Sequence, residues 1–251
     1  MNVKEKVILI TGATGGLGYG AAKLLAQNGA IVWLVSRNGE KCEALAAELS
    51  ANGYAARGAQ LDVCSEEDWI HVFNEILATD GRVDVLLNNA GINIRRPIEE
   101  MEKAEWMTMM EVNTASVFLG CKHVIPIMRK QGGGAIINMS SMCGLIGHRF
   151  TPECYTATKG AMISLSRSAA LEAIPYGVRV NCVCPGATDT PIFWEGETDP
   201  AKRQKLLDQV KIEKPIGRSA ADRKKMAVTA DGRWARTEWR VLKAGPDRTL
   251  L

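Results

Sequence analysis

Two residues four positions apart, Tyr155 and Lys159, are the side chains of this 251-residue sequence best suited to proton transfer. If they lie on a helix, this spacing places both on one face. An isolated tyrosine titrates near pH ~10, which is too high for proton transfer at neutral pH. We expect the ammonium group of Lys159 to stabilise the phenolate and lower the pKa of Tyr155. Such a phenol could protonate a carbonyl oxygen as a hydride reaches the carbon.

A glycine-rich segment from Thr11 to Gly18 has the composition of a phosphate-binding turn. Glycines let the backbone approach a pyrophosphate closely, and the N–H groups of a following helix attract anions. The spacing T-G-x-x-x-G-x-G differs from the usual dinucleotide fingerprint, so the glycines alone would equally fit a structural turn. A predicted strand before the segment and a predicted helix after it favour a dinucleotide-binding turn.

About twenty residues beyond the glycines, the second predicted strand ends at Ser36 and Arg37. A carboxylate here would bind the ribose 2′-hydroxyl and repel a 2′-phosphate, whereas a hydroxyl and a guanidinium suit a phosphate. We therefore expect NADP(H) to be the preferred cofactor, with NAD(H) as the alternative. A solvated surface arginine is the other interpretation of Arg37.

The elements that must position these residues alternate between short apolar runs and longer amphipathic segments. The predicted strands are Val7–Thr11, Ile31–Val35, Ala55–Leu61, Val83–Asn88, Ala135–Met139 and Arg179–Cys184. The predicted helices are Leu17–Asn28, Glu40–Leu49, Ser65–Leu77, Thr114–Arg129 and Tyr155–Ala173. Apolar strands are typical of parallel sheets covered on both faces. The alternation predicts an α/β fold with a doubly wound, Rossmann-type, mostly parallel sheet and helices on both faces.

The composition excludes several classes of protein. The net charge of +3 is too small for a basic nucleic-acid-binding domain. Seven cysteines without a C-x-x-C motif and three histidines argue against a metal site. No apolar run reaches the ~18 residues of a membrane helix, and the first apolar run stops too soon for a signal peptide. We expect a soluble, cytoplasmic protein that binds neither nucleic acid nor membranes.

Several motifs, in their order along the chain, resemble those of the short single-domain branch of the short-chain dehydrogenase/reductase family. The matching residues are Thr11-Gly12-x-x-x-Gly16-x-Gly18, Asn88-Asn89-Ala90-Gly91, Asn113, Ser140-Ser141, Tyr155-x-x-x-Lys159, Pro185-Gly186 and Thr190. The resemblance covers about Val3 to Gly217. Each motif alone is weak evidence, but their common order is strong evidence. The family resemblance implies an NAD(P)-dependent alcohol dehydrogenase or carbonyl reductase.

The resemblance also implies roles for individual residues. Tyr155 would be the proton donor and acceptor, Ser141 would bind the substrate oxygen, and Asn113 would position a water in a proton relay. Lys159 would additionally hold the nicotinamide ribose. The residues expected to contact the cofactor are Thr11, Gly12, Thr14, Gly16, Leu17, Gly18, Ser36, Arg37, Asp62, Val63, Asn89, Ala90, Gly91, Tyr155, Lys159, Pro185, Gly186, Thr188 and Thr190.

Three segments would border a small-molecule alcohol or ketone substrate: Ile92–Arg96, Met142–Phe150 and Ile192–Glu197. Their apolar members are typical of a pocket lining: Ile94, Leu145, Ile146, Phe150, Phe193 and Trp194. Polar or anionic anchors could come from Arg95, Arg96 and His148. The sequence Asn93-Ile94-Arg95-Arg96 resembles that of sugar-acid and deoxy-sugar reductases. The apolar lining resembles that of hydroxysteroid and cyclic-alcohol dehydrogenases. Both substrate classes stay open.

The last residues depart from the family pattern. We expect residues 1–219 to form the dinucleotide-binding and catalytic domain and residues 220–251 to be a divergent tail without a strand-like run. The tail combines tryptophans with basic residues: Arg223, Lys224, Lys225, Arg233, Trp234, Arg236, Trp239, Arg240, Lys243 and Arg248. Nucleic-acid binding is a weaker interpretation of this pattern. We hypothesise that the sheet lacks its last edge strand, which would weaken a homo-dimer or tetramer. A catalytically impaired dinucleotide-binding protein is the alternative function.

Overall fold

The computed structural model describes residues 3–147, 151–186, 188, 190–194 and 199–203, and additionally the backbone of residues 213–218, 226–228 and 233–236. The chain divides into two compact units, residues 1–186 and 187–251. The division into a catalytic domain of residues 1–219 and a tail of residues 220–251 stays a prediction.

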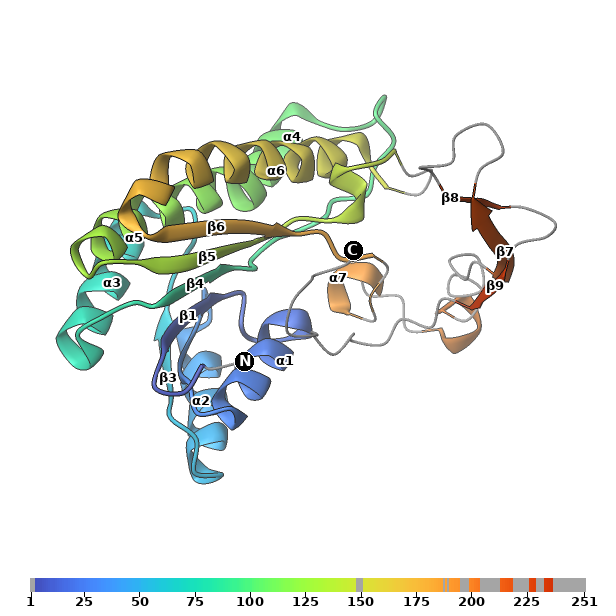
Figure 1. Ribbon diagram of the computed structural model, residues 1–251. Helices are drawn as coiled ribbons and strands as arrows, with labels where there is room; N and C mark the ends of the chain where they lie inside the picture. The colour runs from blue at the N-terminus through green and yellow to red at the C-terminus, as the bar shows by residue number, and fades with distance from the viewer. Residues whose placement is uncertain are drawn as a thin grey trace. The chain divides into compact units, whose positions relative to one another are not determined.

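The first unit contains a six-stranded parallel sheet (Figure 1). Its strands are β1 Val7–Thr11, β2 Ile31–Ser36, β3 Ala56–Gln60, β4 Val85–Asn88, β5 Gly134–Met139 and β6 Val178–Val183. The strand order is β3-β2-β1-β4-β5-β6. The chain thus adds β2 and β3 on one side of β1, and then adds β4, β5 and β6 on the other side. This confirms the predicted doubly wound, Rossmann-type sheet, and each predicted strand lies within two residues of its observed bounds.

The sequences of the edge strands differ from those of the central strands. Every residue of β1 is buried, whereas β3 reads Ala-Arg-Gly-Ala-Gln and buries only Ala59. Strand β6, at the other edge, alternates buried and exposed residues at its start. Strands at an edge are packed on fewer sides, so they tolerate polar residues.

Among the α-helices that connect the strands or follow them are α1 Gly16–Gln27, α2 Gly39–Ala51, α3 Glu66–Asp80, α4 Lys103–Met110, α5 Ser116–Lys130, α6 Glu153–Ala173 and α7 Pro191–Trp194. A π-helical turn, η1 Glu111–Ala115, joins α4 to α5. Two 3₁₀ turns, η2 Met142–Gly144 and η3 Ile174–Tyr176, lie next to α6. The five predicted helices are present, and the sequence reasoning missed α4 and the short helix α7.

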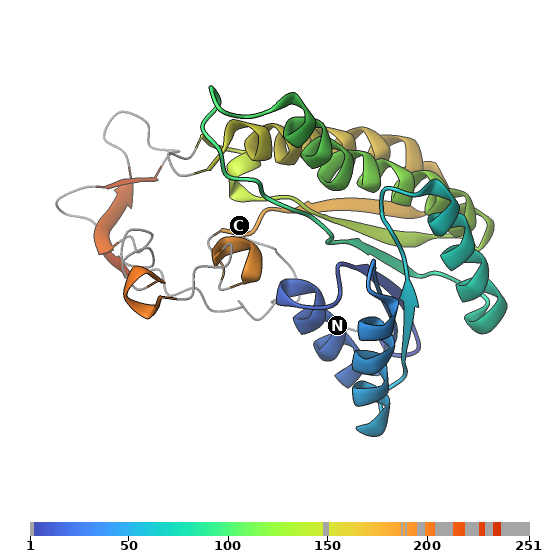
Figure 2. The ribbon, with the colours of Figure 1, turned by 180° about the vertical axis from the view of Figure 1, so that it is seen from behind.

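Helices cover the sheet from both sides. On one side α1 and α2 pack on Ile8 and Ile10 of β1. On the other side α3, α5 and α6 pack on Val7 and Leu9, because successive side chains of a strand point to opposite faces. Figures 1 and 2 show the same two layers, with α1 and α2 together and α5 and α6 together.

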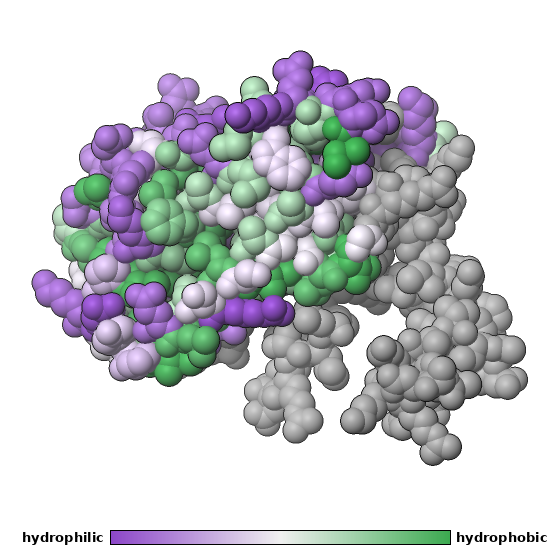
Figure 3. Space-filling view, turned by 90° about the horizontal axis from the view of Figure 1, so that it is seen from above, coloured by the Kyte–Doolittle hydropathy of each residue, from purple (hydrophilic) through white to green (hydrophobic). Residues whose placement is uncertain are grey.

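The outer surface of the α4–α6 layer is less polar at its centre than at its margins (Figure 3). Phe118 of α5 and Leu171 of α6 are 50% and 76% exposed.

Within the described residues, no helix has the length and apolar character needed to cross a bilayer.

A buried chain of polar side chains links two strands to α6. The Asn88 amide donates to Asn138 Oδ1 over 2.9 Å, and the Asn138 amide donates to Ser166 Oγ over 2.9 Å. Ser166 Oγ in turn donates to the carbonyl of Met162 over 2.7 Å. All three side chains are at most 3% exposed. Because buried polar groups are costly when unpaired, this chain fixes α6 against β4 and β5.

The second unit contains three short antiparallel strands, β7 Glu213–Arg218, β8 Met226–Val228 and β9 Arg233–Arg236, in the order β8-β7-β9. The expectation of no strand-like run after residue 219 is therefore wrong for β8 and β9. Periodicity is unreadable in runs of three and four residues. Among the described residues no seventh strand pairs with the six-stranded sheet, which ends at β6.

The carboxylate of Asp84, which is 7% exposed, ties the start of β1 to the start of β4. Burial raises its pKa, but hydrogen bonds from the Arg82 side chain, the Val7 backbone N–H and Lys6 more than offset this effect, so the pKa is lowered. The carboxylate therefore contributes stability above its ordinary pKa, and this contribution is lost as the pH falls through the lowered value.

We predict that Asp84→Asn lowers the free energy of unfolding at neutral pH by about 1–3 kcal/mol, because the donors of Val7 and Arg82 lose a charged acceptor. Urea unfolding at neutral and acid pH measures this effect. The difference in the free energy of unfolding between wild type and variant should become smaller at acid pH. Glu43→Gln, which changes an exposed carboxylate on α2, should leave stability unchanged. A gap that widens in acid would contradict the assignment.

Candidate active site

The turn after β1 packs closely against the segment that follows β4. Gly12 has φ +62°, and a Cβ atom there would lie 2.9 Å from Ala90 Cα. A Cβ atom at Gly18 would lie 2.6 Å from Asn89 Nδ2 and would overlap the Gly12 carbonyl oxygen. Both positions therefore exclude any larger residue, and two chain segments meet at the carboxyl end of the sheet.

Thr11 and Asn89 hold these two segments together. Thr11 Oγ1 accepts from the backbone N–H groups of Asn89 and Ala90 over 2.9 and 3.0 Å. Asn89 Nδ2 donates to the carbonyls of Thr11 and Gly12 over 2.9 and 3.2 Å. Thr11 Oγ1 and Asn89 Nδ2 thus fix the turn after β1 against the segment after β4.

The N-terminus of α1 fits a pyrophosphate. No side chain caps Gly15, the N-cap residue, and the first turn holds no acidic residue. A Cβ atom added at Gly15 would meet no atom within 4 Å, so the turn is open on this side. Uncapped N–H groups and the helix dipole favour an anion here. Thr14, Gly16 and Leu17 belong to the same open turn, and Leu17 is 36% exposed.

The residues at the carboxyl end of β2 lie close to the surface. Ser36 Oγ accepts from the Asn38 backbone N–H over 3.2 Å and contacts Cys42 Sγ at 3.1 Å. Arg37 is exposed. Two residues are expected to bind a 2′-phosphate. The Ser36 hydroxyl is already engaged in its own loop. The exposed guanidinium of Arg37 is therefore the better placed of the two groups.

The segment after β3 is fixed by the N-terminus of α3. Asp62 Oδ1 accepts from the Cys64 N–H over 3.0 Å, and the Asp62 N–H donates to Asp68 over 2.8 Å. The carbonyl of Val63 accepts from Trp69 Nε1 over 3.0 Å. These bonds hold the Asp62 and Val63 backbone at the carboxyl end of the sheet.

Tyr155 and Lys159 lie one turn apart on α6, and Lys159 Nζ is 5.5 Å from the centre of the Tyr155 ring. Lys159 is 3% exposed and donates to the Met139 carbonyl at the end of β5 over 2.9 Å. Burial lowers the pKa of Lys159 to about 8, although Cys182 and Cys184 oppose this effect.

The pKa of Tyr155 is raised to about 12, mainly by burial and further by Cys143. A hydrogen bond from Ser141 and the charge of Arg95 oppose this rise. The expectation that Lys159 lowers this pKa is therefore not met in this structure. The physical reason is that burial disfavours the phenolate, while the Lys159 amine is directed to the Met139 carbonyl.

The two serines after β5 have different partners. Ser140 Oγ donates to the Lys159 carbonyl over 2.8 Å. Ser141 Oγ accepts from the Cys143 N–H over 3.2 Å and hydrogen-bonds the Tyr155 phenol. Ser140 therefore holds α6, whereas Ser141 interacts with the Tyr155 phenol.

Asn113 lies in the π-helical turn and is fully buried. Its Oδ1 accepts from the Ile92 N–H over 2.8 Å, and its Nδ2 donates to the Ile92 carbonyl over 2.9 Å and to Thr158 Oγ1 over 3.2 Å. A Cβ atom at Gly91 would lie 3.2 Å from Asn113 Oδ1 and 3.5 Å from Lys159 Nζ. Gly91, Asn113 and Lys159 thus converge at one point.

Sequence reasoning missed Ser140 and Thr158 as positioning residues. Thr158 Oγ1 donates to the Tyr155 carbonyl over 2.8 Å and accepts from Asn113. A hydroxyl three positions after Tyr155, inside a helix and next to Lys159, was the available signal, because such hydroxyls bond backwards to the helix carbonyls.

Further predicted residues lie in the segment that follows β6. The Pro185 carbonyl accepts from the Met142 N–H over 2.9 Å, which places the Pro185-Gly186 segment beside η2. Thr188 and Thr190 belong to the second unit, where Thr190 Oγ1 donates to the Thr188 carbonyl over 3.2 Å. His148 and Phe150 lie outside the described residues.

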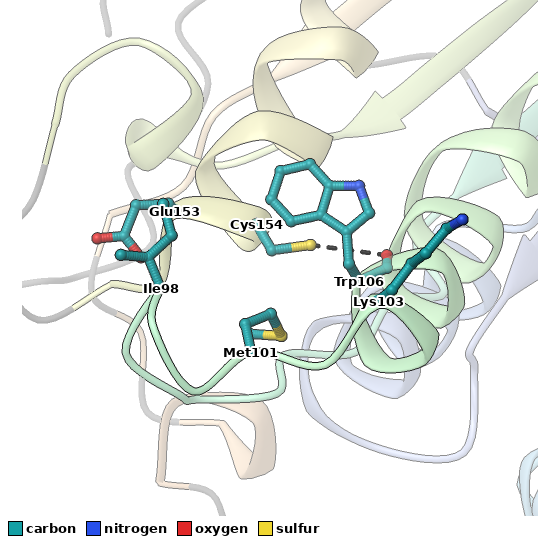
Figure 4. Close-up of a pocket in the computed structure, with 6 residues that line it drawn as sticks. All are labelled: Ile98, Met101, Lys103, Trp106, Glu153 and Cys154. Atoms are coloured by element: carbon teal, nitrogen blue, oxygen red, sulfur yellow. Dashed lines mark hydrogen bonds between the residues drawn. The ribbon is translucent and has the colours of Figure 1, made fainter.

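A cavity of about 270 Å³ lies beside the N-terminus of α6 (Figure 4). Its lining residues are Ile98, Met101, Lys103, Trp106, Glu153 and Cys154. Cys154 Sγ points across it to the Trp106 carbonyl at 3.7 Å. None of the predicted catalytic or cofactor residues lines this cavity.

The chain is similar to known dehydrogenases in sequence and in structure. The sequence model of the short chain dehydrogenase family matches residues 6–201. The chain is 38% identical to cyclopentanol dehydrogenase of Comamonas testosteroni over 205 residues, 82% of each chain. It is 37% identical to trans-4-hydroxycyclohexanecarboxylate dehydrogenase of Sinomonas cyclohexanicum, covering 76% of this chain and 75% of that one. A crystal structure described as a short-chain dehydrogenase/reductase from Burkholderia xenovorans superposes with a TM-score of 0.75 at 33% identity, covering 81% and 82%.

We predict that Lys159→Met stabilises the fold. The pKa of Lys159 is about 8 in the folded chain, against 10.5 ordinarily. Between these two pH values the folded chain binds fewer protons than the unfolded chain, so the free energy of unfolding rises with pH. The cost of burying the charged amine is therefore greatest below about pH 8. Removing the amine should raise the free energy of unfolding at neutral pH by about 2 kcal/mol, net of one lost hydrogen bond.

Urea unfolding near neutral pH and near pH ~10 measures this prediction. The gain should shrink at the higher pH. Lys130→Met, which removes an exposed lysine at the end of α5, should show no such pattern. A variant that is equally destabilised at both pH values would show that the amine is not buried at a cost.

Proposed function

The chain belongs to the short-chain dehydrogenase/reductase family and is an oxidoreductase acting on alcohols, and from this premise we propose that it moves a hydride between NADP(H) and a secondary alcohol or ketone. Tyr155 is the proton donor and acceptor of the proposed reaction. The observation that carries the proposal is the joint placement of Ser141, Tyr155 and Lys159 at the carboxyl ends of β4 and β5.

The raised pKa of Tyr155 keeps the phenol protonated at neutral pH. In ketone reduction the phenol donates this proton to the substrate oxygen as the carbonyl carbon receives the hydride. Ser141 already hydrogen-bonds the phenol, so its hydroxyl lies where it can also bind the same oxygen. In the direction of alcohol oxidation, Tyr155 must first lose its proton, and this direction should gain from a rising pH.

Lys159 stabilises the phenolate that remains after the proton is transferred. Its amine is 5.5 Å from the ring centre in a site shielded from water, where a positive charge acts strongly. A pKa of about 8 leaves Lys159 mostly protonated at neutral pH. Asn113 supports the pair by tying α6 to the segment after β4, and the proposed water relay would pass beside it.

The dinucleotide would lie along the carboxyl edge of the sheet, and it would supply or accept the hydride. Its pyrophosphate suits the uncapped turn of α1. Its adenosine suits the edge formed by Asp62, Val63 and Ala90, and its nicotinamide ribose suits Lys159. Pro185, Gly186, Thr188 and Thr190 are proposed for the nicotinamide end. The preference for NADP(H) rests on Arg37, since Ser36 is engaged locally.

The names of two relatives refer to cyclic alcohols, so we infer that the substrate of this chain is a cyclic secondary alcohol or its ketone. Exposed apolar residues near the site, including Leu145 and Ile146 at 53% and 55% exposure, suit a hydrocarbon ring. A cytoplasmic location and self-association as a dimer or tetramer stay predictions.

Replacing Tyr155 by Phe removes the transferable proton and keeps the ring. We predict that kcat/KM for a cyclic alcohol falls by about 10²- to 10⁴-fold, while the Kd of the dinucleotide changes little. Cofactor absorbance with cyclopentanol or cyclohexanol follows the rate, and cofactor fluorescence follows binding. Tyr176→Phe, at a tyrosine 38% exposed after α6, is the matched control. Cofactor binding without turnover of any alcohol would favour the impaired dinucleotide-binding protein instead.

Replacing Arg37 by Gln tests the cofactor preference. We predict that the Kd of NADPH rises by about tenfold or more, because a charge-assisted hydrogen bond to the phosphate is lost, while the Kd of NADH stays nearly constant. Fluorescence titration with both cofactors measures the ratio. Arg167→Gln, an exposed arginine on α6, should leave both values unchanged. Tighter binding of NADH than NADPH by the wild type would overturn the preference.

A further inference from the structure

Lys159 is bonded through its side chain and through its backbone to two consecutive residues at the end of β5. Its Nζ donates to the Met139 carbonyl over 2.9 Å. Its own carbonyl accepts from Ser140 Oγ over 2.8 Å. The Ser140 N–H donates to the Val183 carbonyl at the end of β6 over 2.8 Å, which ties the Ser140 backbone to the sheet. Both bonds to Lys159 therefore start from a segment that the sheet fixes.

The bond from the Ser140 hydroxyl is additional to the bonds of the helix. The Lys159 carbonyl lies inside α6, where the N–H of Ile163, four residues on, is its regular donor. The hydroxyl is thus a second donor to an oxygen that already has one. Ser140 is 5% exposed. What this buried bond adds is a directional link between the helix and the end of the strand.

The turn after β5 limits how closely α6 can approach this segment. A Cβ atom at Gly144 would lie 2.7 Å from the Lys159 carbonyl carbon and 2.9 Å from the Gly160 nitrogen. Backbone therefore packs directly on backbone, without room for a methyl group. Contact with η2 prevents α6 from moving closer, and the Ser140 hydrogen bond resists its moving away. Together they fix the separation between Lys159 and the end of β5.

This separation determines how far the Lys159 side chain must reach. The lysine stem has four flexible carbons, so the stem alone does not place its amine. With the Met139 carbonyl as partner, the amine lies 5.5 Å from the centre of the Tyr155 ring. We propose, resting on the function proposed above, that the Ser140 hydroxyl positions the Lys159 amine beside the Tyr155 ring, by fixing the Lys159 backbone against the end of β5.

The groups that act on this amine come from two elements. Burial has the largest effect and favours the neutral amine, while Cys182 of β6 and Cys184, which follows β6, favour the charged form. The Tyr155 phenol belongs to the same helix as the amine. An amine released from its place would be less buried, so the pKa of Lys159 would rise from about 8 towards 10.5. The position of the amine is therefore measurable by titration.

The first test is a titration of the Lys159 amine in Ser140→Ala, which needs no turnover. NMR of protein labelled with ¹³C-lysine follows the side-chain signal, and Lys159→Met identifies it. We expect the midpoint to rise by about one pH unit or more. Ser140→Thr keeps the hydroxyl and should restore the wild-type midpoint. Ser116→Ala is the matched control on α5, because it removes a similarly buried hydroxyl that bonds to the Val112 carbonyl over 2.6 Å.

The kinetics of cyclohexanol oxidation provide a second readout. Lys159 stabilises the phenolate only as the proton leaves Tyr155, so Ser140→Ala should lower kcat by about tenfold and leave KM nearly unchanged. The rising limb of the pH–rate profile should move to higher pH, because the phenolate forms less readily. Ser140→Thr should recover both properties.

Gly144→Ala tests the same separation by a different change. The added methyl group must push α6 away from η2, so we expect the same rise in the Lys159 midpoint with the Ser140 hydroxyl still present. Gly20→Ala on α1, where a Cβ atom would meet no atom within 4 Å, is the matched control and should leave the midpoint unchanged. Circular dichroism shows whether each variant folds.

Two results would overturn the proposal. One is a folded Ser140→Ala variant in which Lys159 titrates as in the wild type, because the hydroxyl would then serve packing alone. The other is a Ser116→Ala variant with an equal rise, because the loss of any buried hydroxyl would then explain it. The expected titration without turnover of any alcohol would leave the role of Ser140 intact and contradict the proposed function. Turnover of alcohols with an unchanged titration would do the reverse.

Discussion

The side-chain amide of Asn113 joins two parts of the chain that the site needs and that are far apart in the sequence. It forms hydrogen bonds with both backbone groups of Ile92, which follows β4, and with the Thr158 hydroxyl on α6. The amide is completely buried, so each of its bonds is made where water cannot replace it. A π-helical turn places it there, and such turns redirect side chains within otherwise regular helices. The position of the loop that bears Arg95 and the position of Tyr155 both depend on this contact.

Burial then sets the protonation of the catalytic pair. It moves the pKa of Tyr155 up and that of Lys159 down, so both shifts favour the neutral forms. A phenol that is reluctant to ionise is a poor base but a ready hydrogen-bond donor. The low local polarity that produces these shifts also strengthens the attraction between phenolate and ammonium once the proton has left. The same environment thus holds the proton before the reaction and stabilises the ion pair after it.

The sequence predicted the sheet because its strands are apolar and its helices are periodic, and it predicted that Tyr155 and Lys159 share a helix face. It missed α4, whose Lys-Ala-Glu-Trp-Met-Thr-Met-Met sequence lacks a clear apolar stripe. The partners of Thr11 lie 78 and 79 positions away, so no local pattern could reveal that its hydroxyl serves the turn. The direction of the Tyr155 pKa shift also escaped prediction, because it depends on how deeply the folded chain buries the phenol.

The buried chain from Asn88 through Asn138 to Ser166 has a consequence for how accurately the active site is assembled. Apolar contacts between α6 and the sheet would tolerate small sliding movements, since dispersion has little directionality. Amide-to-hydroxyl bonds tolerate almost none, and a shift of one residue in β5 would turn Asn138 to the opposite face. Only one alignment of α6 with β4 and β5 allows all the hydrogen bonds of this polar chain to form. That alignment determines the position of Tyr155 relative to Ser141.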